Sequence, residues 1–342
     1  MSAEPLVPTE LVEPAETLPG EPGAGPRYRS PLLGQAGAVA GQQPDDGVAG
    51  HYGDPLREQR ALATGRVLVD RSHREVLTVS GPDRRSWLHS LTTQHLEALP
   101  VGQGTEALVL SPNGHIEHHL ALVDDGTTTW IDVEPGTSAA LLAFLDRMRF
   151  MLRVELADRT ADVAVLTAVD LGGPTAGDAP DALVVRAMPW GTDLLVARDR
   201  LSAIVSSSAA TGRALAGHDA WEAARVERGR PRLGSETDHR TIPNETPWLQ
   251  TALHLQKGCY RGQETVARTH NLGRPPRRLV RLQLDGGLPP RDAPVQWEGR
   301  TIGRVTTPVY HYELGPIALA VIKRNVPDDV PLVADGLAAA IG

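Results

Sequence analysis

Two periodicities of hydrophobic positions run along this chain, an alternating one typical of strands and a three-to-four-residue one typical of amphipathic helices. The strand-like apolar segments in the first half lie at 67–70, 75–80, 108–110, 115–123 and 127–133. The helical patterns lie at 54–64, 138–151, 200–210 and 219–228. The sequence therefore predicts helices and strands mixed along most of its length.

Asn113 and Gly114 give the strongest local signal. They separate two apolar runs, and both residue types tolerate the positive φ that a two-residue hairpin turn requires. The spacing predicts a tight β-hairpin at this point.

The pattern changes in the last quarter of the chain. Short strand-like runs separated by glycine and proline turns lie at 279–284, 295–297, 301–306, 317–322 and 330–333. This arrangement is typical of a small β-barrel or sandwich.

The N-terminal 46 residues differ from the rest in composition. They contain eight prolines and six glycines, and Tyr28 is their only aromatic residue. Such a segment buries too little apolar surface to fold, so 1–46 is expected to be a disordered tail. The domains expected after it are a first α/β lobe at 47–155 completed by 215–270, a second α/β lobe at 156–214 and a barrel at 271–342.

Composition narrows the class of protein. The chain has 342 residues, 41% of them hydrophobic, and a net charge of −8, which argues against a general nucleic-acid-binding surface. An apolar stretch of roughly 18–20 residues and a secretory signal are both missing from the sequence, so a cytoplasmic protein without a membrane segment is expected. Arg274, Arg277, Arg278 and Arg281 form a local basic run that fits either a solvated turn or an anion contact.

Cys259 is the only cysteine, so the chain can form no intrachain disulfide and cannot by itself supply the roughly four ligands of an iron–sulfur cluster. It lies between Lys257 and Arg261, just before a helix predicted to begin at Gln263. Nearby cations and a helix N-terminus favour a thiolate. The alternative is a tight turn in which Cys259 is a small buried residue.

Glu227 stands at the end of the helix predicted at 219–228. Helical spacing places it on the same face as the small residues Ala220, Ala223 and Ala224. A carboxylate in the last turn is disfavoured by the helix dipole, which suggests that it binds a ligand. A solvated glutamate paired with Arg230 or Arg232 is the alternative.

The strand after the hairpin carries three histidines. His115, Glu117 and His119 alternate on one face and His118 lies on the other. Zinc needs three or four ligands, and a solvated strand face explains this pattern more simply. No metal site is therefore predicted.

The segment Lys257–Glu264 closely resembles the K-G-C-Y-x-G-Q-E signature of YgfZ-type folate-binding proteins, a branch of the aminomethyltransferase superfamily. Further similarity runs from about residue 51 to 331 and includes the Asn113-Gly114 hairpin and 225–231. The resemblance implies an α+β fold, a three-lobed ring of two α/β lobes and a C-terminal β-barrel.

Tetrahydrofolate, or a one-carbon derivative of it, is the cofactor that the resemblance implies, and the central opening of the ring is its place. Glu227 is expected to face the pterin ring, whose edge offers two parallel donors to one carboxylate. Cys259 is the candidate catalytic residue at the rim. The other residues expected to bind the cofactor are Arg225, Trp248, Lys257, Gly258, Tyr260, Gly262, Gln263 and Glu264.

The implied function is an accessory role in the assembly or repair of iron–sulfur enzymes, including those that modify tRNA, with these enzymes or their assembly proteins as partners. The rival is a folate-dependent aminomethyltransferase acting on a lipoyl carrier protein. That enzyme carries an aspartate on the strand after the hairpin, where this chain has only Glu117. Whether any reaction is catalysed stays open, and a folate-independent scaffold is the third alternative.

Overall fold

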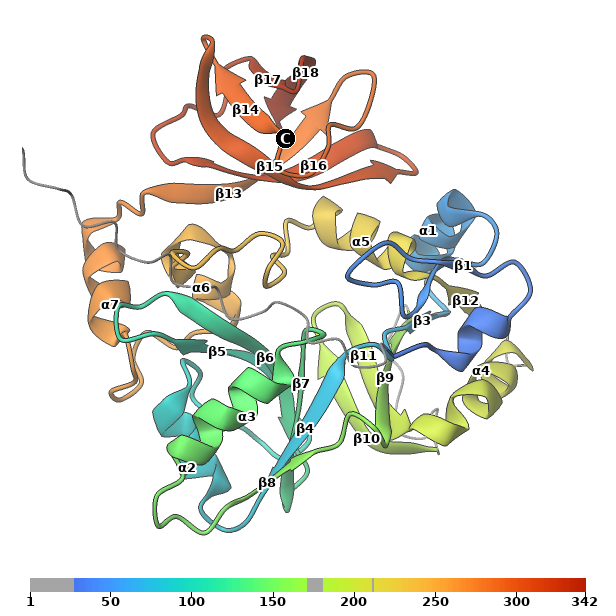
Figure 1. Ribbon diagram of the computed structural model, residues 1–342, viewed down its shortest axis with the longest axis vertical. Helices are drawn as coiled ribbons and strands as arrows, with labels where there is room; N and C mark the ends of the chain where they lie inside the picture. Colours follow the sequence, from blue (N-terminus) through green and yellow to red (C-terminus); the bar gives the residue numbers. More distant parts are fainter. Residues whose placement is uncertain (1–27, 171–180, 211) are drawn as a thin grey trace, which may run out of the picture.

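The structure is a computed structural model, and it describes residues 28–170, 181–210 and 212–342. Two β-sheets lie together below a β-barrel, and helices cover their outer sides (Figure 1). This arrangement confirms the predicted α+β fold with a C-terminal barrel. Within the described residues, none of the helices combines the length and apolar character that crossing a membrane requires.

The first sheet is fully antiparallel and is covered on one face by helices α2 (Arg84–Leu91) and α3 (Ser138–Arg147). That face is apolar and includes Leu77, Leu120 and Ile131. Across the sheet the strands are β5 (Gly104–Leu110), β6 (Ile116–Asp124), β7 (Thr128–Val133), β4 (Glu75–Ser80) and β8 (Glu155–Asp158).

The second sheet combines strands from distant parts of the chain. In spatial order they are β10 (Ala182–Met188), β11 (Gly191–Ala197), β9 (Val163–Val169), β3 (Val67–Asp70) and β12 (Ala214–Ala216). Its helices are α1 (Pro55–Thr64), α4 (Leu201–Ala210) and α5 (His218–Glu227). Asp54 caps α1, because its side chain accepts hydrogen bonds from the amides of Leu56 and Arg57.

Buried ion pairs join the two sheets. Arg186 of β10 is fully buried and donates to Asp132 of β7, to Asp193 of β11 and to the carbonyl of Ala121. Arg74 adds contacts to Asp132 and to Glu134. The face of the first sheet that meets the second is therefore charged, in contrast to the apolar face under its helices.

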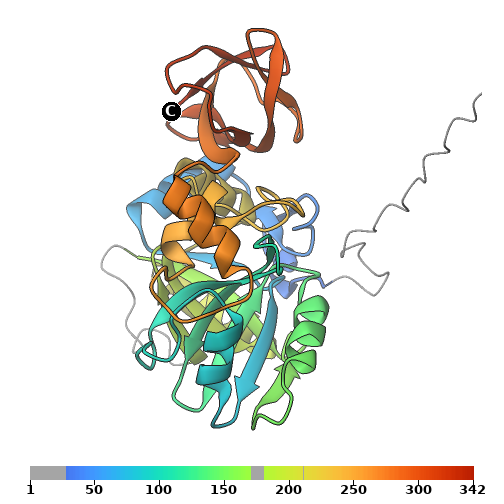
Figure 2. The same cartoon turned by 90° about the vertical axis from the view of Figure 1, so that its left-hand side faces the viewer.

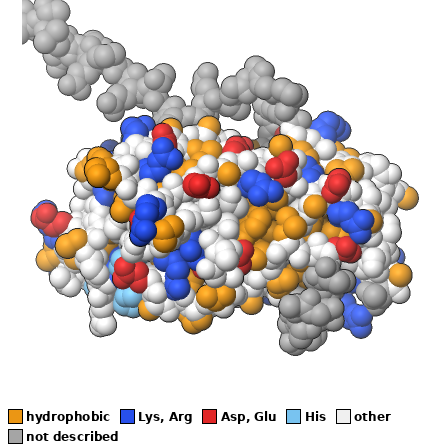
Figure 3. All heavy atoms as spheres, turned by 90° about the horizontal axis from the view of Figure 1, so that it is seen from below, with side chains coloured by type: hydrophobic (Ala, Val, Ile, Leu, Met, Phe, Trp, Pro, Cys, Tyr) orange, Lys and Arg blue, Asp and Glu red, His pale blue; other side chains and the backbone are white. Residues whose placement is uncertain are grey.

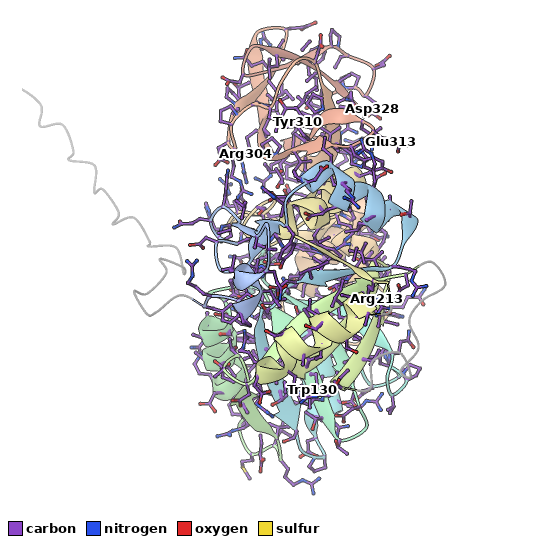
Figure 4. All side chains as sticks on the ribbon, turned by 90° about the vertical axis from the view of Figure 1, so that its right-hand side faces the viewer. Trp130, Arg213, Arg304, Tyr310, Glu313 and Asp328 are labelled. Atoms are coloured by element: carbon purple, nitrogen blue, oxygen red, sulfur yellow. The ribbon has the colours of Figure 1, made fainter. Side chains whose placement is uncertain are left out.

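The barrel is closed and has six strands, one more than the sequence predicted. In spatial order they are β13 (Arg277–Leu284), β16 (Gly315–Lys323), β15 (Arg300–His311), β14 (Pro294–Trp297), β17 (Leu332–Ala334) and β18 (Leu337–Ile341). The β15–β16 turn lies against α1, where Gln59 bonds to the backbone of Tyr310 and Tyr312 (Figure 4).

The segment between α5 and the barrel contains short helices and the fully buried side chain of Trp248. It contains the 3-10 helix η4 (Pro243–Glu245) and helices α6 (Trp248–Thr251) and α7 (Gln263–Leu272). The view from the side shows α7 beside the first sheet, below the barrel (Figure 2). At the end of the molecule opposite the barrel, hydrophobic side chains are mixed with charges of both signs (Figure 3).

Two predictions about organisation need correction. Of the tail expected at 1–46, residues 1–27 lie outside the described part, but residues 28–46 are ordered. They form the 3-10 helix η1 (Pro31–Gly34) and strand β1 (Val39–Ala40), which pairs with β2 (Ala49–His51). Leu32 is fully buried in the core of the second sheet. This segment therefore packs on the core although its proline and glycine content predicted disorder.

The lobe boundaries also differ from the prediction. Strand β3 belongs to the second sheet, because it pairs with β9 and β12, and β8 belongs to the first, because it pairs with β4. Residues 71–74 connect the two sheets. Sequence neighbours usually pair, which is why β3 and β4 were expected in one lobe.

Candidate functional site

A cavity of about 260 Å³ lies where the two sheets meet helix α5. Its size is close to the lower end of typical small-molecule sites. Polar and aromatic side chains dominate its wall. They are Arg71, His73, Arg74, Glu106, His119, Glu134, Trp190, His218, Trp221, Glu222, Arg225, Arg228, Arg230, Arg232 and Trp248.

Three tryptophans give the cavity its aromatic surfaces. Arg230 lies over the rings of Trp190 and Trp221, with its guanidinium carbon 4.3 and 5.1 Å from their centroids. Trp248 of α6 stacks on His119, with ring centroids 4.5 Å apart and planes inclined by 16°. A flat ligand would therefore meet aromatic walls contributed by separate parts of the chain.

Two cavity carboxylates are held by arginines. Glu222 receives two bonds from Arg225, at 2.9 and 2.8 Å. Although burial opposes ionisation, the charges of Arg225 and Arg232 lower the pKa of Glu222 to about 2. Glu134 is held by Arg74 and by Arg232, which donates at 2.8 Å. Both carboxylates are thus charged and fixed in position.

Arg230 differs from its neighbours. Within residues 28–170, 181–210 and 212–342, its guanidinium forms none of the ion pairs or hydrogen bonds seen for Arg71, Arg74, Arg225 and Arg232. Burial, together with the charge of Arg71, lowers the pKa of Arg230 to about 9. The cavity therefore presents a cation that none of the carboxylates in the described part of the chain neutralises directly.

Asp45, from the segment expected to be disordered, lies at the edge of the cavity with His73 and His218. Its oxygens lie 3.0 and 3.2 Å from the Nε2 atoms of these histidines, close enough for the three groups to hold a metal ion. Arg232, however, donates to both oxygens of Asp45, at 2.7 and 2.6 Å. A guanidinium thus already supplies the positive charge that a metal would bring.

Glu106 of β5 and His119 of β6 form a buried pair on the cavity face of the first sheet. The Nε2 atom of His119 lies 2.8 Å from Oε1 of Glu106. Although burial opposes ionisation, hydrogen bonds from His119 and Thr251 and the charge of Arg230 lower the pKa of Glu106. A charged Glu106 makes Nε2 the donor and leaves Nδ1 as the ring nitrogen for a ligand.

The comparisons with known proteins point to one superfamily. The family described as "GCVT N-terminal domain" matches residues 37–192. An aminomethyltransferase of Thermus thermophilus is 27% identical over 301 residues, covering 80% of this chain and 84% of its own. This chain is thus similar to aminomethyltransferases over most of its length.

Other relatives of this chain carry different names. A putative chloroplast transferase of Arabidopsis thaliana is 26% identical over 298 residues, covering 78% of this chain and 67% of its own. A mitochondrial homologue of the iron–sulfur cluster assembly factor IBA57 from Mycosarcoma maydis is 26% identical over 238 residues, covering 64% and 57%. The glycine cleavage system aminomethyltransferase T of Bartonella henselae has the same fold, with a TM-score of 0.78 at 19% identity over 91% of this chain and 94% of its own.

The turn that carries the K-G-C-Y-x-G-Q-E sequence lies outside the cavity wall. Lys257 is buried and donates through Nζ to the carbonyls of His89, Thr92 and Gln94, which anchors the turn to the end of α2. Cys259 is exposed and forms no disulfide. Arg261 pairs with Glu117 of β6 at 3.0 Å. The alternative of a buried cysteine is thus wrong, and the turn displays the thiol on the surface.

Two glycines explain why this turn meets the hairpin. Gly262, at φ 79°, precedes α7, and a Cβ on it would come within 2.5 Å of the carbonyl of Ser111 and 2.7 Å of Cα of Gly114. Gly114, at φ 82°, similarly approaches Thr265. The two sequence motifs therefore contact each other through backbone that only glycine permits.

Of the ten predicted site residues, Arg225 and Trp248 line the cavity. Cys259, Lys257, Gly258, Tyr260, Gly262, Gln263 and Glu264 belong to the turn and the start of α7. Glu227 also lies apart from the cavity wall. Its carboxylate is 3.8 Å from His311 of the barrel, and its side chain is 39% exposed. The structure thus does not bring Glu227 and Cys259 together at one cavity.

The cavity face of α5 carries Trp221, Glu222 and Arg225 rather than the small residues. Ala220 and Ala223 are buried in packing contacts, so small side chains here allow close approach of protein and not of ligand. The expectation of a solvated face carrying His115, Glu117 and His119 is wrong at His119, which is buried, whereas Glu117 is exposed and His115 is half-buried. Alternation along the strand could have indicated this, because it places His119 and Leu120 on opposite faces of the sheet.

Proposed function

We propose that this chain binds tetrahydrofolate, or a one-carbon derivative, in the cavity between the two sheets. The observation that supports this most directly is the cavity itself, which has tryptophan walls and a fixed, charged carboxylate, in a chain similar to aminomethyltransferases over most of its length. The pterin edge has parallel donors, and Glu222 can accept hydrogen bonds from them in the role that the family resemblance implied for Glu227. Trp190, Trp221 and Trp248 suit the flat ring.

Isothermal titration with tetrahydrofolate tests this proposal. Glu222→Gln keeps the shape of the side chain but removes its charge, and is expected to weaken binding by about 1.5–3 kcal/mol. Glu227→Gln is the matched control on the same helix and is expected to bind like the wild type. The reverse result would return Glu227 to the site and exclude the cavity as the pterin pocket.

We further propose the finer role that the signature turn implies, an accessory function in the assembly or repair of iron–sulfur enzymes, including tRNA-modifying ones, in the cytoplasm. Two findings favour it. A relative is named as a homologue of a cluster assembly factor, and Cys259 is exposed on a turn anchored by Lys257. An exposed thiol is accessible to a partner protein or its cluster.

Complementation of a strain lacking the protein tests this role. Cys259→Ser is expected to restore less iron–sulfur enzyme activity than the wild type, whereas Ser111→Ala, at the neighbouring hairpin, is expected to restore it fully. Full rescue by Cys259→Ser would reduce the cysteine to a surface residue of the turn.

Aminomethyl transfer is the second candidate, because several curated relatives are named aminomethyltransferases. It predicts the release of ammonia and methylene-tetrahydrofolate from an aminomethylated carrier protein. Against it, the cavity face of β6 carries His119 paired with Glu106, while Glu117 is committed to Arg261. Absence of ammonia release from such a carrier would leave the accessory role.

A further inference from the structure

We propose that the cavity contains an acid–base centre in which His119, positioned by Glu106, moves a proton during hydrolysis of a formyl group carried by folate. This inference rests on the proposed binding of folate. The three groups that carry it are His119, Glu106 and Arg230, all on the cavity wall.

His119 is suitably oriented for a general base. Its Nε2 atom is held by Glu106 at 2.8 Å, and its ring is fixed by stacking on Trp248. A histidine oriented by a carboxylate presents its other nitrogen as an acceptor, as in nucleophile–base–carboxylate sites. Both members of the pair are less than one-tenth exposed, so their hydrogen bond is sheltered from bulk water.

Arg230 supplies the second requirement. Its guanidinium lies between Trp190 and Trp221 without a carboxylate partner among the described residues, and its charge acts on Glu106. An unneutralised cation in a sheltered cavity stabilises negative charge that develops on a ligand oxygen. A base beside such a cation suits attack of water on a carbonyl carbon.

The reaction balances without an oxidant or reductant. Water loses a proton to Nδ1 of His119 while its oxygen bonds to the formyl carbon, whose carbonyl oxygen gains negative charge beside Arg230. The bond from carbon to the folate nitrogen then breaks, and that nitrogen receives the proton from His119. Formic acid leaves, with the second proton of the water still on its oxygen, and ionises to formate by releasing that proton to solvent, while tetrahydrofolate remains.

The competing explanation is that Glu106 and His119 only stabilise the sheet. His118 allows the two roles to be separated, because it lies next to His119 on β6, is equally buried and faces the apolar side of the sheet away from the cavity. Replacement of either histidine disturbs a buried position on the same strand, but only His119 reaches the ligand.

The experiment measures release of formate from 10-formyltetrahydrofolate by the full chain at neutral pH. His119→Asn is expected to lower kcat at least 100-fold, because general base catalysis contributes about 10²–10⁴-fold. Arg230→Gln is expected to lower it about 100-fold. His118→Asn is expected to stay within twofold of the wild type. Glu106→Gln is expected to lower kcat more than it raises KM.

A second measurement does not depend on turnover. Nitrogen NMR of the ligand-free protein is expected to show the Nε2-protonated tautomer for His119, and Glu106→Gln is expected to shift the ring to a mixture. Formate release no faster than in buffer, or equal rates for the wild type and His119→Asn, would overturn the inference. If the wild type then still binds tetrahydrofolate and Glu222→Gln weakens that binding, the proposed function stands without the hydrolysis. If the wild type binds no folate, both the proposed function and the hydrolysis are excluded.

Discussion

The two faces of the first sheet are both buried, but one is apolar and the other carries paired charges. Under α2 and α3 the face is apolar, and residues such as Leu120 and Ile131 are buried without polar partners. On the other face Asp132, Glu134 and Glu106 are also buried, each with a matched cation or histidine. The stability of the apolar face depends on filling the space with side chains, whereas the stability of the charged face depends on each buried charge having its partner. The cavity borders the charged face, so the ion pairs of that face hold its wall in a fixed geometry.

Arg186→Met tests the charged face and is expected to have the largest effect on stability. The substitution leaves Asp132 and Asp193 buried without their shared cation, and the free energy of unfolding is expected to fall by about 3–5 kcal/mol in denaturant titration. Arg200→Met is the control, because Arg200 forms an exposed pair with Asp181 and should cost at most about 1 kcal/mol. Equal stability of Arg186→Met and the wild type would show that the charged face tolerates a missing partner.

His118 sharpens the comparison, because it is a polar group on the apolar face. Burial alone lowers the pKa of His118 to about 4. Between pH 4 and the ordinary value of about 6.5 the unfolded chain binds the proton and the folded chain does not, so stability falls on acidification. About 2 kcal/mol is expected to be lost through this residue between pH 7.5 and pH 5.

Urea titrations at both pH values check this expectation. His118→Asn should show a smaller difference between the two pH values than the wild type. A difference as large in the variant would mean that other buried groups, such as His73 and Asp45, carry the acid sensitivity.

Ile131→Val tests the tolerance of the apolar face and should have the smallest effect. Removal of one buried methylene group there is expected to cost about 0.5–1.5 kcal/mol, measured by thermal or denaturant unfolding. Tetrahydrofolate affinity should stay unchanged, because Ile131 points away from the cavity. A larger loss of stability than in Arg186→Met would reverse the order proposed for the two faces.

Local signals carried most of the fold prediction. The hairpin at Asn113-Gly114 and the helix starting at Gln263 depend on neighbouring residues, and both are present. The hairpin is not the two-residue turn that was predicted, because only Gly114 has a positive φ and its amide donates to the carbonyl of Ser111. The sixth barrel strand was missed because Leu337–Ile341 is mostly alanine, a residue with weak strand preference.

The cavity was harder to predict because its members are distant in sequence. Nothing near Asp45 indicates that Arg232 will bind it, and the composition of residues 1–46 argued for disorder. Glu227 was predicted to bind the ligand from its place in the last helical turn, from the small residues on its helix face and from the family resemblance, but those small residues pack against protein. Arg230 and the Glu106–His119 pair can be found only when two sheets and α5 are assembled.

The contact between Asp45 and Arg232 has a consequence for biosynthesis. The two residues are 187 positions apart, and a ribosome adds about 5–20 residues per second, so roughly ten to forty seconds separate their emergence. During that interval the carboxylate has been made but its guanidinium has not. A nascent chain can therefore form the Asp45–Arg232 contact only late in translation. A translational pause between the two residues would prolong the lifetime of a partly folded chain in which Asp45 lacks this partner.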